Sequence, residues 1–165
     1  MATILPFVLL AMSTVAPERD HTELGTAIAT VIDEQPPLFK DDASKTRTAA
    51  FAVAVAFRES SLRNGAVGDH GRSFCAYQIH LPGRTTTPEG WSGEDLLADV
   101  NHCVSVGFHM LRQSIRIDGE HPLAFFARGP AWRSDVARRL SRDRVALAKR
   151  IHAAAIAALA KASSS

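Results

Sequence analysis

A glutamate follows directly on a long apolar segment of the sequence. Residues 49–57 consist only of alanine, valine and phenylalanine, and Arg58, Glu59 and two serines come next. A carboxyl group at such a boundary lies half in the core and half in a cleft, a setting in which proteins raise the pKa of a general acid. Glu59 is therefore the candidate catalytic residue.

A polar, glycine-rich stretch begins a few residues after Glu59. Residues 68–79 read GDHGRSFCAYQI. Glycine and polar residues at this density predict turns and short strands, with residues 74–79 as the expected strand. We expect this stretch to form the wall of a cleft opposite Glu59.

The remaining sequence predicts helices around these two segments. Residues 43–59 are expected to form a buried central helix, because a helix that is apolar on all sides must be surrounded, and Asp42 and Ser44 are its candidate caps. A capping box of Ser92 and Asp95 starts a helix expected to reach about residue 117. Further helices are predicted over residues 20–34, 123–127 and 134–161. The expected fold class is mainly α (α+β), with a small strand and turn region after the central helix.

The chain has the size and composition of one globular domain. Its 165 residues include 46% hydrophobic and 22% charged residues, values that support neither a disordered chain nor a protein with several membrane spans. No linker or repeat divides the sequence. Residues 20–161 are therefore expected to form a single domain, followed by a frayed tail over 162–165.

The first sixteen residues carry no charged side chain and include an apolar run at 4–12. This pattern resembles a signal peptide over residues 1–16, although the positive residues that usually precede the run are missing. A run this short does not span a bilayer as a helix, so no membrane span is expected. The signal interpretation favours export to the periplasm or out of the cell. The alternative is a first core helix that stays in the mature protein.

Cys75 and Cys103 are the only cysteines of the chain. In a reducing compartment two isolated cysteines are most often buried thiols, whereas after export they would form a disulfide. Such a bridge would close a loop of about 29 residues and contribute about 3.6 kcal/mol in the chain-entropy model. Neither cysteine belongs to a CxxC pair and the seven histidines do not cluster at metal-ligand spacing, so no metal site is predicted.

Basic residues are concentrated between residues 128 and 150. This segment holds eight arginines and lysines against two aspartates. It could attract a polyanion such as nucleic acid or an acidic cell-wall polymer, or it could be the solvated face of a surface helix. No aromatic residues alternate with the basic ones as in proteins that bind single strands. We therefore favour the solvated helix and expect no nucleic-acid partner.

Three motifs follow one another in this part of the chain: an apolar helix that ends in Glu-Ser, a turn with Gly-Asp, and a later Ser-x-x-x-x-Gln-Ile. Together they resemble the lysozyme-like superfamily, in its lytic transglycosylase (SLT) and goose-type lysozyme branch. The resemblance covers residues 43–130. Its matching residues are Glu59-Ser60, Ala66-Val67-Gly68-Asp69, Gly71, Ser73 and Gln78-Ile79, with a weaker match at 124–129.

The resemblance implies cleavage of the β-1,4 bond between N-acetylmuramic acid and N-acetylglucosamine in peptidoglycan, with Glu59 as general acid and without a cofactor. A glycosidic oxygen is a poor leaving group unless it is protonated as the bond breaks, and a neutral carboxyl supplies that proton. In the transglycosylase branch the same carboxylate then acts as base while the muramoyl 6-hydroxyl closes onto the anomeric carbon. The expected partner is the peptidoglycan glycan strand, bound by a monomer.

A second carboxylate separates the two branches. In animal lysozymes an aspartate stands five residues before the matching glutamine, where this chain has Ser73, and this favours a transglycosylase. Asp69 keeps a goose-type hydrolase open, because it could position a water molecule. It is equally compatible with a simple turn beside Gly68.

The resemblance also suggests how the sugar groove is lined. Ser73, Tyr77, Gln78 and Phe126 are expected in it, with Gln78 bonding to substrate amide or hydroxyl groups; for Tyr77 and Gln78 the alternative is a half-buried strand edge. Two features depart from the family pattern: Cys75 replaces a glycine, and Phe126 with the alanine after it replaces a Tyr-Asn pair. These departures motivate a second hypothesis, a non-catalytic peptidoglycan-binding protein on the same fold.

Overall fold

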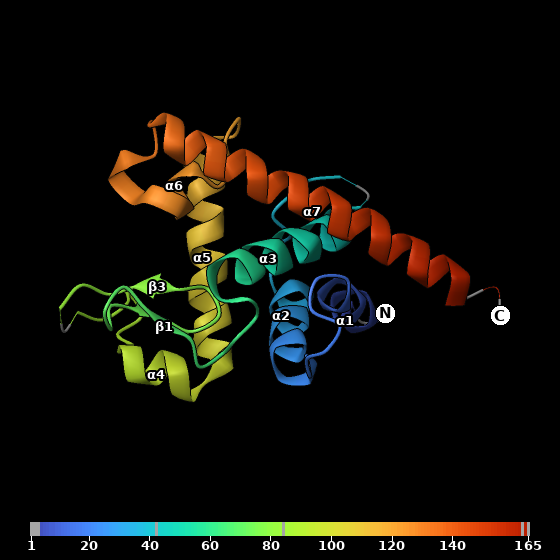
Figure 1. Ribbon diagram of the computed structural model, residues 1–165, viewed down its shortest axis with the longest axis horizontal. Coiled ribbons are helices and arrows are strands. Elements are labelled where there is room, and N and C mark those ends of the chain that lie inside the picture. Colours follow the sequence, from blue (N-terminus) through green and yellow to red (C-terminus); the bar gives the residue numbers. More distant parts are fainter. Residues whose placement is uncertain (1–3, 42, 84, 163, 165) are drawn as a thin grey trace.

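The computed structural model describes residues 4–41, 43–83, 85–162 and 164. These residues form a mainly helical domain with a small antiparallel sheet, as predicted (Figure 1). The helices are α1 (Leu5–Ser13), α2 (Thr22–Glu34), α3 (Ser44–Ser60), α4 (Gly93–Ala98), α5 (Val100–Ile117), α6 (Ala124–Arg128) and α7 (Asp135–Ala162). The strands are β1 (Val67–Gly68), β2 (Ser73–Phe74) and β3 (Ile79–His80), and a 3-10 turn, η1 (Gly129–Ala131), follows α6.

Helix α3 is the centre of the molecule. Its residues 48–56 are all buried, and α7, α1 and α2 pack around it (Figure 1). The alternation of alanine with larger residues lets these neighbours approach closely while still filling the core. The predicted central helix is thus confirmed. Its N-cap is Ala43, which has no side chain able to cap; Ser44 already lies in the helix, and Asp42 lies outside the described residues.

Helix α1 belongs to the core. Phe7, Val8, Ala11 and Met12 are at most 3% exposed, and the helix packs against α2, α3 and α7. Of the candidate signal peptide at 1–16, residues 1–3 lie outside the described residues. The packing of the rest fits the alternative of a first core helix. Within the described ranges, no helix is both long and apolar enough to cross a membrane.

The prediction of one strand over residues 74–79 is wrong. Phe74 ends β2, Ile79 begins β3, and residues 75–78 form a turn between the two strands. Cys75 and Gln78 adopt left-handed backbone conformations with φ of 64° and 49°, which end β2 and allow β3 to pair with it in the antiparallel direction. Ser73 lies opposite both Gly68 and His80 in the sheet register. The reversal therefore brings three polar or small positions side by side.

The second half of the chain follows the predicted helices with one interruption. The capping box of Ser92 and Asp95 is present, but the helix expected to continue to residue 117 breaks at Asp99. The Asp99 carboxylate accepts a hydrogen bond from the Asn101 backbone N–H and caps α5. Of the predicted frayed tail at 162–165, Ala162 still belongs to α7, whereas residues 163 and 165 lie outside the described residues.

Candidate functional site

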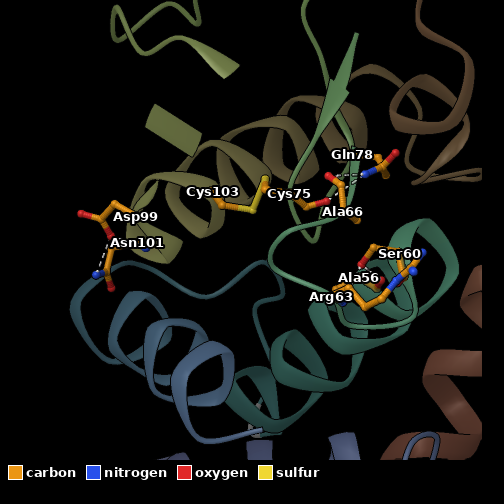
Figure 2. The surroundings of a disulfide bond; sticks show 9 residues. All are labelled: Ala56, Ser60, Arg63, Ala66, Cys75, Gln78, Asp99, Asn101 and Cys103. Atoms are coloured by element: carbon orange, nitrogen blue, oxygen red, sulfur yellow. Dashed lines mark hydrogen bonds between the residues drawn. A yellow bond between two sulfur atoms is a disulfide. The ribbon is translucent and has the colours of Figure 1, made fainter. Parts of the chain in front are cut away.

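Glu59 lies in the last turn of α3, where the chain reverses sharply. Ser61 and Leu62 both adopt left-handed conformations, and the Leu62 N–H donates back to the Ala56 carbonyl. The Ser60 hydroxyl donates to the same carbonyl at 3.0 Å and accepts from the Arg63 N–H at 3.0 Å (Figure 2). These bonds replace the partners that a helix end lacks and fix the backbone that carries Glu59.

The Glu59 carboxylate is paired with an arginine from the last helix. Arg144 donates to Glu59 Oε1 from Nη2 at 2.5 Å and from Nε at 3.2 Å. The Arg144 side chain is 9% exposed and that of Glu59 19%, so the pair lies largely out of water. Among the residues that the structure describes, only Oε1 of Glu59 accepts these bonds, which leaves Oε2 as the oxygen available to another group.

Arg144 is not readily recognisable as a site residue from sequence alone, because the basic residues of 128–150 have the pattern of a solvated helix face. Most of them do carry exposed side chains, but Arg144 is buried. A signal was available in the spacing of the buried α7 residues. Arginine occupies one position in a series that is otherwise small or apolar at spacings of three and four: Ala137, Ser141, Arg144, Leu147, Ala148, Ile151 and Ala155.

The sheet provides a hydrogen-bonded group of three polar side chains. The Ser73 hydroxyl donates to Asp69 Oδ2 at 2.5 Å and lies 3.1 Å from His80 Nδ1. Since the hydroxyl proton is directed at Asp69, the serine oxygen accepts from His80, which assigns the proton to Nδ1. The Ser73 hydrogen bond lowers the pKa of Asp69, and His80 acts in the same direction.

Gln78 holds the turn together from inside. Its side-chain NH2 group donates to the carbonyls of Ala66 at 3.2 Å and Cys75 at 3.0 Å (Figure 2). A methyl group at Gly68 would overlap the Gln78 side-chain oxygen, so a larger residue there would displace the Gln78 side chain. The amide protons are thus used within the protein, and the oxygen is the part of this side chain left to accept from a ligand.

A disulfide attaches this turn to α5. Cys75 and Cys103 are bonded, with their Cα atoms 6.1 Å apart (Figure 2). Both cysteines are buried. The bridge predicted for an exported protein is present, and it fixes the polar turn to α5.

These segments enclose one side of a cleft of about 570 Å³. Of the residues expected in the site, it brings together Glu59, Asp69, Ser73, Gln78 and Phe126. The cleft is completed by residues outside the predicted set, among them His80, Met110, Phe125 and Arg128. Carboxylate, hydroxyl and imidazole groups from two separate segments therefore meet in one space of a size that holds small-molecule groups.

Tyr77 does not line the cleft, contrary to the prediction. Its side chain is fully buried and packs against Gly107 of α5, where a methyl group would approach the ring to 2.6 Å. Burial raises the pKa of its hydroxyl far above the usual value. The left-handed residues on either side of Tyr77 turn it toward α5, away from the cleft.

The cleft holds carboxyl side chains of the kind that can exchange protons with a bound molecule. Glu59 and Asp69 are its two carboxylates, and Arg144 and Ser73 fix one oxygen of each. Within the described part of the chain, no three His, Cys, Asp or Glu side chains are grouped so that they could hold a metal ion. Comparison with protein-family models, with curated proteins and with solved structures finds no match to this chain.

Proposed function

We propose that this protein cleaves the glycan strand of peptidoglycan, between N-acetylmuramic acid and N-acetylglucosamine, as a lytic transglycosylase. The observation that carries the proposal is the meeting of Glu59 with the Asp69, Ser73 and Gln78 segment in one cleft. These are the residues of the lysozyme-like motif, and they are separated by up to nineteen positions in the chain.

Glu59 performs both proton transfers in this proposal. The reaction starts from the carboxylic acid form of Glu59, with the proton on Oε2 and Arg144 bonded to Oε1. Glu59 donates this proton to the glycosidic oxygen as the C1–O bond breaks. It then takes the proton of the muramoyl 6-hydroxyl as that oxygen closes onto C1, which restores the acid. In this proposal Oε2 is the oxygen that meets the substrate, because Oε1 is bonded to Arg144. Arg144 keeps its charge throughout, so it orients the carboxylate and exchanges no proton.

A hydrolase is the second candidate, and Asp69 is the observation that favours it. This carboxylate lines the same cleft as Glu59 and remains ionised, because the Ser73 hydrogen bond lowers its pKa. An ionised carboxylate across a cleft from a general acid is the arrangement in which water is activated. In this case a water molecule held by Asp69, and not the 6-hydroxyl, would attack C1.

The proposal also requires that the protein is exported. A disulfide such as Cys75–Cys103 persists in oxidising compartments and is rare in the cytosol. Peptidoglycan lies outside the cytoplasmic membrane, so an enzyme acting on it must reach that space.

The test is the release of soluble muropeptides from purified sacculi by the wild-type protein and three variants. Glu59→Gln keeps an oxygen that accepts from Arg144 and removes the exchangeable proton, so it should abolish release with the fold intact. Asp69→Asn should retain activity if the 6-hydroxyl attacks and lose it if Asp69 holds a water. Glu94→Gln is the matched control, because Glu94 is exposed on α4, outside the cleft. Sacculus binding without release by the wild type would support the non-catalytic alternative.

A further inference from the structure

A second cavity, of about 560 Å³, shares no residue with the Glu59 cleft. It lies between the first turns of α3, the middle of α7, Phe39 of the loop before α3 and residues 119–122 before α6. Its volume is within the range of sites that bind small molecules. Nothing in the proposed glycan cleavage uses it.

The inner wall of this cavity is apolar. Phe39 and Phe51 meet edge to face with their ring centres 5.2 Å apart, and Ala50, Pro122 and Val145 complete the wall. Phe39 and Val145 keep part of their surface exposed. Covering such a wall with the hydrocarbon part of a ligand removes apolar surface from water, which favours binding.

The rim of the cavity is basic. Arg142 and Lys149, one above the other on α7, are exposed, and neither forms an ion pair with any residue that the structure describes. Arg47 also lines the cavity, but it is paired with Asp41. Glu120 is the one acidic residue among those that line it.

The aromatic wall does not favour a cation. The Arg47 guanidinium already lies over the Phe39 ring, 4.5 Å from its centre. A cationic ligand in this cavity would therefore meet three basic side chains, Arg47, Arg142 and Lys149. An anionic group placed beside Arg142 and Lys149 would find two donors without a carboxylate partner.

We propose that this cavity binds a small amphipathic anion, with a hydrocarbon part against Phe39, Phe51 and Val145 and a carboxylate or phosphate beside Arg142 and Lys149. The two anionic groups share the chemistry that these side chains recognise. The inference is independent of peptidoglycan cleavage, because the two sites have no residue in common.

The test is titration of the full chain with three probes of equal chain length: decanoate, decyl phosphate and decyltrimethylammonium, all below their micelle concentrations. Calorimetry gives the affinity, and the NMR shifts of the Val145 methyl groups report the place. At least one anion should bind and shift Val145, and the comparison of the two shows whether a carboxylate or a phosphate is preferred. The cationic probe should bind at least about tenfold more weakly than that anion.

Two double variants test which basic residues bind the anion. Arg142→Gln with Lys149→Gln should weaken binding of the anion about tenfold or more. The matched control, Arg139→Gln with Arg150→Gln, removes two exposed basic residues of the same helix that do not line the cavity, and it should leave the affinity within about twofold. All four positions are exposed, so folding should be retained. The proposal is overturned if neither anion binds at millimolar concentration, if the cation binds equally, or if both double variants behave alike.

Discussion

From the pairing of Arg144 with Glu59 we predict how much an Arg144 variant loses in free energy of unfolding. Replacing Arg144 by methionine keeps most of the side-chain volume but leaves the Glu59 carboxylate, 19% exposed, without its charged partner. Removing one member of a fully buried ion pair costs about 3–5 kcal/mol. Because Glu59 retains some contact with solvent, we expect Arg144→Met to lower the free energy of unfolding by about 2–3 kcal/mol.

The chain offers a matched control for this variant. Arg58 and Asp143 also join α3 to α7, at 3.0 Å, but their side chains are 38% and 47% exposed. Surface pairs of this kind contribute less than about 1 kcal/mol, so Arg58→Met should have a small effect. The same two helices are linked in both cases, which leaves burial as the main difference.

The assay is urea denaturation with the disulfide intact. With a slope of about 2 kcal/mol per molar urea, the Arg144→Met midpoint should fall by about 1–1.5 M and that of Arg58→Met by less than about 0.5 M. In a Glu59→Gln background the effect of Arg144→Met should shrink, because no carboxylate is left unpaired. Equal effects of Arg144→Met and Arg58→Met, or an unchanged effect in the Glu59→Gln background, would refute the reasoning.

Three further predictions concern other parts of the molecule. Replacing both Cys75 and Cys103 by alanine should lower the free energy of unfolding by about 3.6 kcal/mol, from the loop they close; a loss below about 1 kcal/mol in urea denaturation would show that the unfolded chain is not restrained by the bridge. Burial lowers the pKa of His152, so the unfolded chain binds this proton more readily and stability should fall as pH drops below about 6.5. The loss between neutral and acidic pH, measured by denaturation, should be smaller in His152→Gln, and an equal loss would contradict the assignment. The buried Tyr77 hydroxyl has no hydrogen-bond partner among the described residues, so Tyr77→Phe should change stability by no more than about 0.5 kcal/mol or raise it. Loss of sacculus cleavage by a stably folded Tyr77→Phe would contradict the placement of Tyr77 outside the cleft.

The helices could be predicted because their signals are local. The apolar run of α3, the capping box at Ser92 and the glycine after α6 each act within a few residues. The break at Asp99 is also local, but an aspartate can cap a helix or lie within one, and the sequence does not choose. The place of Glu59 at the end of the central helix followed directly from the helix prediction.

The parts that could not be predicted depend on contacts between distant segments. Arg144 is a basic residue among basic residues, and only the position of α3 beside α7 makes it the partner of Glu59. The strand predicted at 74–79 became a turn because two non-glycine residues take left-handed conformations, which residue type alone disfavours. The same turn buries Tyr77 and brings His80 beside Ser73.

The mass of the muropeptides released from sacculi tests the central claim, that Glu59 alone serves as acid and base, most directly. The wild-type protein should give 1,6-anhydro ends, lighter by one water than reducing ends, and Glu59→Gln should give no products. Reducing ends would contradict the transglycosylase mechanism and assign the second step to a water molecule. Full activity of Glu59→Gln would contradict the assignment of the site itself.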